Sequence, residues 1–316
     1  MANKIKQRQP LAAALLSLFM MGLGQLYNGQ PRRAAVFFAI AIFPVAFLAP
    51  ISHLLLSFQG IMAIYAGILI TVGIRVFAII DAFIGARRIG MIELRRYNRW
   101  YVYVSVILVI AAIQSAFELA IERPVIAFSI PSGAMQPTLL VGDYVSVDKD
   151  AYAGQTPERG DIVVFRKPPE NETDYVMRIV GLPGERIQMV NGVLHIDGEA
   201  ANREPIEDFI ENGRRAASQY IETLPGERQH RILETSGDQG FLDNTRLYTV
   251  PGASYFLMGD NRDNSADSRV LGPIPEEKLV GKVRILYFSI SGGSAFWQVW
   301  KWPSEIRYDR IGSMVN

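Results

Sequence analysis

Two halves of the chain carry different hydrophobic patterns. Up to about residue 121 long apolar runs dominate, which is typical of apolar helices. From there on, short apolar runs alternate with turn residues, which is typical of β-strands. The pattern predicts a helical part over residues 1–121 and a β-dominated domain over residues 122–316. Residues 199–243 are more charged, and we interpret them as a peripheral insertion into that domain.

Three apolar runs in the first half predict membrane-spanning helices, at residues 34–56, 61–80 and, more briefly, 101–117. About 20 apolar residues are needed to cross a bilayer. Residues 11–27 are a shorter run, broken by Gly22, Gly24 and Gln25, and are interpreted as a re-entrant or interfacial helix. A signal peptide is the rival interpretation, but no small-x-small cleavage site follows this run.

Charge in the loops predicts the orientation of these helices. The loop between the second and third predicted spans is rich in arginine and is expected in the cytoplasm: Arg87, Arg88, Arg95, Arg96 and Arg99. Residues 57–60 carry no Lys or Arg and are expected outside. The third span then leads outward, so the β-domain is expected on the extracytoplasmic side of a multi-pass membrane protein.

Strand and turn signals support the β-domain. Strands are expected at residues 144–148, 162–165, 255–258 and 283–288. Asn191-Gly192 between two valines predicts a hairpin with a two-residue turn.

Composition excludes some kinds of chemistry. Hydrophobic residues make up 49% of the chain, and 32 Lys and Arg face 31 Asp and Glu, so no overall positive field points to nucleic acid. The absence of cysteine excludes disulfides, thiolate catalysis and cysteine metal ligands. The three histidines, at 53, 195 and 230, lack the neighbours of a metal or nucleophile site. Asp260, Asp263 and Asp267 lack the glutamate spacing of a calcium loop, so we expect no metal and no cofactor.

Four blocks of the β-domain point to a family: residues 131–149, 159–166, 175–187 and 259–269. The first begins Pro-Ser-Gly-Ala-Met-Gln-Pro-Thr-Leu, the third begins Tyr-Val-Met-Arg-Ile-Val-Gly-Leu-Pro-Gly, and the fourth reads Gly-Asp-Asn-Arg-Asp-Asn-Ser-Ala-Asp-Ser-Arg. In this order they resemble bacterial type I signal peptidase, a family of serine endopeptidases with a serine nucleophile and a lysine general base. The resemblance implies a β-dominated, catalytic-type domain on a helical anchor in the bacterial plasma (inner) membrane, acting in protein secretion.

The two reactive positions depart from the family pattern. Where the resemblance places the serine this chain has Ala134, and where it places the lysine it has Met177. Alanine offers no nucleophile, and a thioether cannot accept a proton at neutral pH. Ser132 is two residues from the lost nucleophile, while Lys149 and Lys167 are expected to be solvated. The Ser-Lys dyad is therefore predicted to be lost and the chain to be a pseudoenzyme.

The resemblance implies roles for further residues. Ser132 would contribute to the oxyanion hole, and Ser265, Asp267 and Arg269 would form the network that orients the base. Pockets for small side chains of the substrate would be lined by Phe128, Ile130, Pro131, Met135, Leu139, Tyr175 and Val176.

We therefore expect the chain to bind the C-terminal end of signal peptides of exported preproteins without cutting them. Two alternatives stay open: an active signal peptidase that carries inactivating substitutions, and a structural membrane protein that kept only the fold. The expected partners are preproteins and the lipid bilayer, with an active signal peptidase or the secretion machinery as a further candidate. The aromatic patch at residues 296–302 favours contact with the membrane surface.

Overall fold

The computed structural model describes residues 5–48, 57–120, 125–167, 174–211, 213–291, 298 and 300–315. It divides into two compact units, one of Met1–Leu54 and Gln59–Arg123 and the other of Leu55–Phe58 and Pro124–Asn316. The expected boundary between residues 121 and 122 lies outside the described residues.

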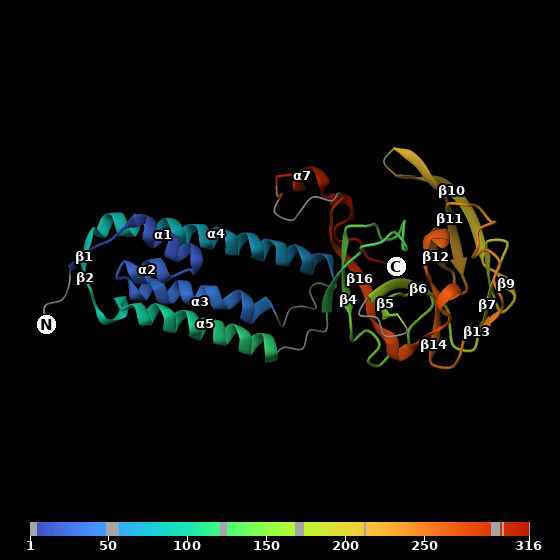
Figure 1. The fold of residues 1–316 in the computed structure, drawn as a ribbon, viewed down its shortest axis with the longest axis horizontal. Coiled ribbons are helices and arrows are strands. Elements are labelled where there is room, and N and C mark those ends of the chain that lie inside the picture. The colour runs from blue at the N-terminus through green and yellow to red at the C-terminus, as the bar shows by residue number, and fades with distance from the viewer. Residues whose placement is uncertain are drawn as a thin grey trace. The chain divides into compact units, whose positions relative to one another are not determined.

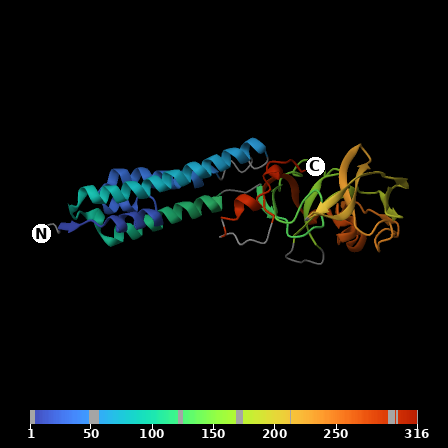
Figure 2. The same ribbon diagram turned by 90° about the horizontal axis from the view of Figure 1, so that it is seen from above.

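The first unit is helical. Its helices are α1 (Pro10–Phe19), α2 (Leu23–Tyr27), α3 (Pro31–Leu48), α4 (Phe58–Ile89) and α5 (Trp100–Ala120). Short strands β1 (Ile5–Gln7) and β2 (Met91–Glu93) pair antiparallel, and η2 (Arg96–Asn98) precedes α5. Figure 2 shows α3, α4 and α5 side by side. Within the described residues, α4 alone is long and apolar enough to cross a membrane.

The predicted spans correspond to parts of these helices. Residues 61–80 lie within α4 and residues 101–117 within α5, while the run at residues 34–56 continues past the end of α3 into residues outside the described ones. One candidate span is consistent with a membrane anchor, and the multi-pass arrangement remains a prediction.

The apolar run at residues 11–27 is two short helices instead of one span. α1 ends at Phe19, followed by Met20 in an extended conformation, and Gly22, with a left-handed φ of 99°, starts α2. Gln25 is fully buried, and its amide accepts a hydrogen bond from Ser17 at 3.1 Å and donates one to the Ala78 carbonyl at 2.8 Å. These bonds satisfy the amide where α2 packs against α4, so this polar residue does not need solvent.

A seven-stranded antiparallel sheet forms the core of the second unit (Figure 1). Its order is β15-β14-β6-β5-β16-β4-β3. The strands are β3 (Val125–Ser129), β4 (Asp143–Asp148), β5 (Ile162–Arg166), β6 (Asp174–Gly181), β14 (Ser254–Met258), β15 (Ile274–Pro275) and β16 (Leu279–Ser289). The four strands expected from the sequence all belong to this sheet, and each contributes apolar side chains to one buried cluster. Phe256 and Met258 of β14 instead pack in a second cluster, with residues of the four-stranded sheet.

A second, four-stranded sheet has the order β13-β7-β8-β9. Its strands are β7 (Arg186–Val190), β8 (Val193–Ile196), β9 (Glu199–Ala200) and β13 (Tyr248–Thr249). The predicted hairpin joins β7 to β8, and both turn residues have positive φ, 47° at Asn191 and 74° at Gly192. Asparagine and glycine tolerate this left-handed backbone, which explains why the hairpin is readable from the sequence.

The charged segment folds as a three-stranded sheet of β10 (Asn202–Glu211), β11 (Arg214–Leu224) and β12 (Arg228–Glu234). It is less peripheral than its charge indicated. The Leu233 amide donates to the Asp260 carbonyl at 2.8 Å, so the end of β12 is bonded to the fourth sequence block. Residues 199 and 200 belong to the second sheet and not to this one.

Short helices complete the unit: η3 (Arg262–Asn264), α6 (Ser268–Leu271), η4 (Glu276–Lys278), α7 (Trp302–Glu305) and η5 (Tyr308–Arg310). Much of the aromatic patch at residues 296–302 lies outside the described residues. Of its described part, Trp300 is 70% exposed, whereas the Trp302 ring lies 6.2 Å from that of Phe288.

Candidate functional site

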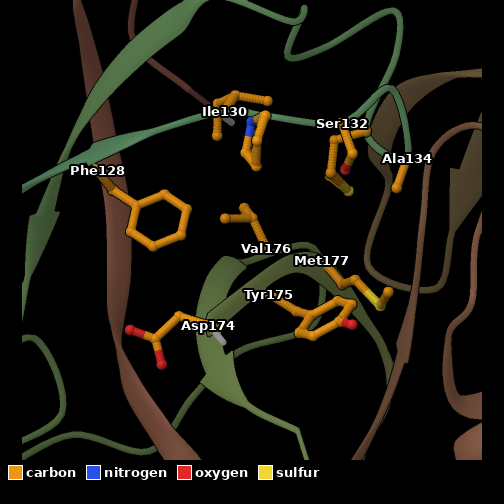
Figure 3. Close-up of a pocket in the computed structure, with 10 residues that line it drawn as sticks. Phe128, Ile130, Ser132, Ala134, Asp174, Tyr175, Val176 and Met177 are labelled. Carbon is orange, nitrogen blue, oxygen red and sulfur yellow. The ribbon is translucent and has the colours of Figure 1, made fainter. Parts of the chain in front are cut away.

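A cavity of about 190 Å³ opens between the turn after β3 and the start of β6. In Figure 3, the residues of the turn lie on one side and those of β6 on the other, with Phe128 at one end. The lining is mostly apolar: Phe128, Ile130, Pro131, Ser132, Ala134, Met135, Asp174, Tyr175, Val176 and Met177. Such a lining suits small apolar side chains, with few groups able to react.

Ala134 from the turn and Met177 from β6 both line the cavity towards the end away from Phe128 (Figure 3). Met177 stands opposite Val163 of β5 in the sheet and is 1% exposed. A side chain so deeply buried among apolar neighbours is stable as a thioether and would be costly as an unpaired ammonium.

Gly259 brings the turn of residue 134 together with Ser265. A Cβ atom on Gly259 would lie 2.2 Å from Ser265 Oγ and 2.6 Å from the Ala134 carbonyl oxygen, so only glycine allows this approach. The backbone amide of Asn261 donates a hydrogen bond to the Ala134 carbonyl at 3.0 Å, and the side-chain amide of Asn261 donates one to the Gly133 carbonyl at 3.0 Å. The loop carrying Ala134 is therefore held by the fourth sequence block.

The Ser265 hydroxyl is buried and has no hydrogen-bond partner among the described residues. Buried hydroxyls are almost always bonded, because an unbonded one loses its contacts with water without replacement. The Ser265 hydroxyl is therefore a buried group whose capacity for a hydrogen bond is unused among the described residues.

Asp267 and Arg269 form an ion pair that is fully buried on both sides. Arg269 donates from Nε at 2.9 Å, from a terminal nitrogen at 2.8 Å and from its backbone amide at 3.0 Å. The Gly259 amide donates to the same carboxylate at 3.1 Å. Four donors to one carboxylate fix the backbone of the block around Ser265.

A second buried pair joins β6 to the same block. Arg178 donates to both carboxylate oxygens of Asp260, at 2.9 and 2.8 Å, and Thr138 donates to Asp260 at 2.5 Å. Burial alone would raise the pKa of Asp260, but the charge and hydrogen bonds of Arg178 bring it below its ordinary value. Arg178 follows Met177 and Asp260 follows Gly259, so this pair sets the position of the cavity wall against the block.

His230 and Glu222 of the three-stranded sheet lie next to the Arg178–Asp260 pair. His230 Nε2 lies 3.4 Å from Glu222 and 3.9 Å from Asp260, and Glu222 accepts two hydrogen bonds from Arg262. Burial, followed by the charge of Arg178, lowers the pKa of His230 to about 4. This histidine is neutral and structural at pH 7.

The structure brings nine of the sequence-predicted residues to the cavity wall: Ser132, Ala134, Met177, Phe128, Ile130, Pro131, Met135, Tyr175 and Val176. Leu139 does not line it, since its side chain is completely buried in the sheet core. Its place at the pocket is an expectation from the resemblance alone, and the packing of Leu139 against the sheet removes it from the wall. Ser265, Asp267 and Arg269 lie behind the wall, around Gly259.

The sequence missed Asp174, whose chain position before Tyr175 was the only signal for it. No lysine is among the residues that line the cavity. Lys149 is exposed, and the Lys167 ammonium lies 5.4 Å from the centre of the Tyr175 ring. His195 is half-buried on β8, and His53 lies outside the described residues. Among the described residues, the cavity wall presents neither a histidine nor a lysine as a general base.

Comparison with known proteins identifies the class of this scaffold. A family model described as "Signal peptidase, peptidase S26" matches residues 97–288. Signal peptidase I of Rickettsia typhi is 34% identical over 188 residues, which are 51% of this chain and 71% of the relative. Signal peptidase I of Rickettsia bellii (strain OSU 85-389) is 30% identical over 220 residues, 58% and 76% of the two chains. The chain belongs to the signal peptidase family, peptidase S26.

A solved structure is also similar in sequence. The crystal structure of a signal peptidase I from Enterococcus faecalis V583 is 24% identical, covers 40% of this chain and 97% of its own, and has a TM-score of 0.26.

Proposed function

We propose that this chain binds the C-terminal end of signal peptides in the cavity between β3 and β6 and does not cleave them. The observation that carries the proposal is that Ala134 and Met177 line one cavity on a signal peptidase scaffold. We assign Ala134 to the position of the nucleophile and Met177 to the position of the general base. With neither a hydroxyl nor an amine at these positions, the first bond-forming step has no nucleophile and no proton acceptor.

The buried Ser265 hydroxyl supports the assignment of Met177. It lacks a partner in the described part of the chain, as expected for a group that would bond to a base amine replaced here by a thioether. We assign Ser265, together with the Asp267–Arg269 pair behind it, to the network that would orient such a base. We assign Ser132 to the oxyanion hole, because it lines the cavity beside residue 134.

The strand arrangement supports the binding mode. β3 is the last strand of the seven-stranded sheet and carries Phe128 at the cavity. An extended peptide can pair with an edge strand while alternate side chains enter pockets. Small residues before the cleavage point of a signal peptide fit a cavity of about 190 Å³.

Two measurements on the purified full chain in detergent test this proposal. The first is binding of a fluorescent peptide ending in Ala-x-Ala, with Val176→Trp to fill the cavity and exposed Val141→Trp as the matched control. We expect binding by the unchanged chain and by the Val141 variant, and none by the Val176 variant. The absence of binding in all three would refute peptide recognition and favour a structural role.

The second measurement is preprotein cleavage by the unchanged chain, by Ala134→Ser, and by Ala134→Ser/Met177→Lys. We expect cleavage only by the double variant, since the hydroxyl needs the amine to lose its proton. Cleavage by the unchanged chain would show another nucleophile, and Ser132→Ala would then be the next variant to test.

We also propose that residues 1–121 anchor the protein in the bacterial plasma (inner) membrane through several spans, with the β-domain on the extracytoplasmic side. The apolar helix α4 supports an anchor. Because the chain has no cysteine, single cysteines can be introduced and labelled from outside with an impermeant maleimide. We expect labelling at exposed Asp208→Cys and none at Arg95→Cys until the membrane is opened; the reverse pattern would overturn the orientation.

A further inference from the structure

Three carboxylates from separate segments meet in the β-domain, away from the cavity. Glu234 ends β12, Asp243 lies in the loop before β13, and Asp263 lies in η3. One oxygen of each lies within 4.8 Å of one oxygen of the other two. Glu234 and Asp243 are buried, with 1% and 0% exposure, and Asp263 is half-buried.

Three carboxylate oxygens of this cluster lack hydrogen-bond donors among the described residues. Neither carboxylate oxygen of Glu234 has a hydrogen-bond partner among the described residues, and one oxygen of Asp243 is also unbonded. The other Asp243 oxygen accepts from the Gly240 amide. Asp263 accepts from the amides of Thr235 and Ser236, both at 2.7 Å, and from the Thr235 hydroxyl at 3.1 Å.

The basic groups near the cluster are engaged elsewhere. Arg203 lies 3.8 Å from Glu234, but it donates to both oxygens of Asp238, at 2.8 and 2.9 Å. Arg262 is paired with Glu222. Burial raises the pKa of Glu234 to about 8. The repulsion of Asp263 and Asp243 also raises this pKa, whereas the charge of Arg262 lowers it.

The absence of a side chain at Gly240 allows two of the carboxylates to lie close to the backbone. A Cβ atom on Gly240 would lie 2.7 Å from an oxygen of Asp263 and 3.0 Å from an oxygen of Asp243. Glycine at this position therefore lets Asp243 and Asp263 lie side by side at the backbone.

We propose that Glu234, Asp243 and Asp263 form a binding site for a hard divalent cation, Ca²⁺ foremost. Carboxylate oxygens are the ligands that Ca²⁺ prefers, and its variable coordination suits ligands from a strand end, a loop and a short helix. Zn²⁺ is disfavoured, since the cluster offers no histidine or cysteine. From the sequence we expect no metal, because along the chain Asp263 stands only among Asp260 and Asp267, without the spacing of a calcium loop. The partners of Asp263 in this cluster lie 20 and 29 residues away in the chain.

A bound cation would join β12 to η3, which precedes Ser265 directly. It would thus fix the three-stranded sheet to the block behind the cavity. The site itself does not depend on the proposed peptide binding, and its test needs no peptide or cleavage.

The test uses the full chain in detergent after removal of metal with EDTA. Calorimetric titration with CaCl₂ should show one saturable site, with weaker binding of Mg²⁺, and CaCl₂ should raise the melting temperature. Glu234→Gln keeps the shape of the side chain and should weaken Ca²⁺ binding at least tenfold. Asp208→Asn, an exposed acid in the same sheet, should bind as the unchanged chain does.

A further comparison guards against a variant that merely misfolds. In EDTA, Glu234→Gln should melt at the same temperature as the unchanged chain or higher, since it replaces a buried acid whose ionisation burial and the neighbouring carboxylates oppose. Only the unchanged chain should gain from CaCl₂. Asp243→Asn should behave in the same way. No saturable binding of Ca²⁺ or Mg²⁺ at millimolar concentration, or equal binding by Glu234→Gln, would overturn the proposal and leave a carboxyl pair that shares a proton.

Discussion

Lysine in place of Met177 should destabilise the fold in a way that depends on pH. Met177 is 1% exposed and packs in the apolar cluster of the main sheet. Burial lowers a lysine pKa by up to about 3 to 5 units, so an amine at this depth would be neutral near pH 7. Deprotonating a lysine with an ordinary pKa of about 10.4 costs about 5 kcal/mol at pH 7 and about 2 kcal/mol at pH 9. A hydrogen bond to the free Ser265 hydroxyl should offset about 1 kcal/mol.

The sign of the pH dependence follows from proton binding. Between the lowered pKa of the folded variant and about 10.4, the unfolded state binds more protons, so stability of Met177→Lys rises with pH. The net loss is about 4 kcal/mol at pH 7 and about 1 kcal/mol at pH 9. At about 2 to 4 °C for each kcal/mol in a domain of this size, the melting temperature should fall by roughly 8 to 16 °C at pH 7 and by about 2 to 4 °C at pH 9.

Thermal denaturation in detergent at both pH values measures this difference, with Met177→Leu as a control that does not titrate. Adding Ser265→Ala in both the Met177 and Met177→Lys backgrounds isolates the hydrogen bond, and the coupling should be about 1 kcal/mol. A Met177→Lys variant more stable than the unchanged chain, or a difference that does not vary with pH, would refute the reasoning. Zero coupling to Ser265 would refute its assignment as a partner of the base.

Other consequences of the buried groups can be measured in the same way. Because the pKa of His230 is lowered to about 4 from 6.5, the unfolded chain binds the proton first as the pH falls, and the free energy of unfolding should fall by up to about 3 kcal/mol between pH 6.5 and 4. In thermal melts, His230→Gln should reduce this pH dependence, whereas the control His195→Gln should keep it. An unchanged pH dependence in His230→Gln would contradict the prediction. Gly259→Ala should cost about 1 to 3 kcal/mol and weaken peptide binding, because the new methyl meets a backbone carbonyl, whereas Gly252→Ala, with open space around it, should do neither. Arg262→Met leaves a buried carboxylate without its partner and should cost about 3 to 5 kcal/mol in chemical denaturation; a loss below 1 kcal/mol would show that the pair does not contribute.

Local signals explain what the sequence predicted well. The Asn191-Gly192 turn is specified by two residues that tolerate positive φ, so its hairpin needs no distant contact. The run at residues 162–165 is apolar on both faces because β5 lies in the middle of the seven-stranded sheet. In such places the local residues and the final fold favour the same structure.

Contacts between distant charged residues explain what the sequence could not predict. Arg178 and Asp260 are 82 positions apart and Glu222 and Arg262 are 40 apart, yet each pair is buried. A charged residue in the sequence is expected at the surface, because a charged side chain is buried only when it has a partner. The sequence does not show which distant residue that partner is. For this reason the three-stranded sheet was interpreted as peripheral.

The same pairs explain how a signal peptidase scaffold can keep its shape with Ala134 and Met177 at the cavity. The Asp267–Arg269 and Arg178–Asp260 pairs satisfy each other and the surrounding backbone, and neither uses a group from residue 134 or 177. Groups that act as a unit in catalysis lose nearly all of it when one is replaced, whereas the bonds of these two pairs do not depend on the side chains at positions 134 and 177. The cavity can therefore keep its shape on this fold without a hydroxyl at position 134 or an amine at position 177.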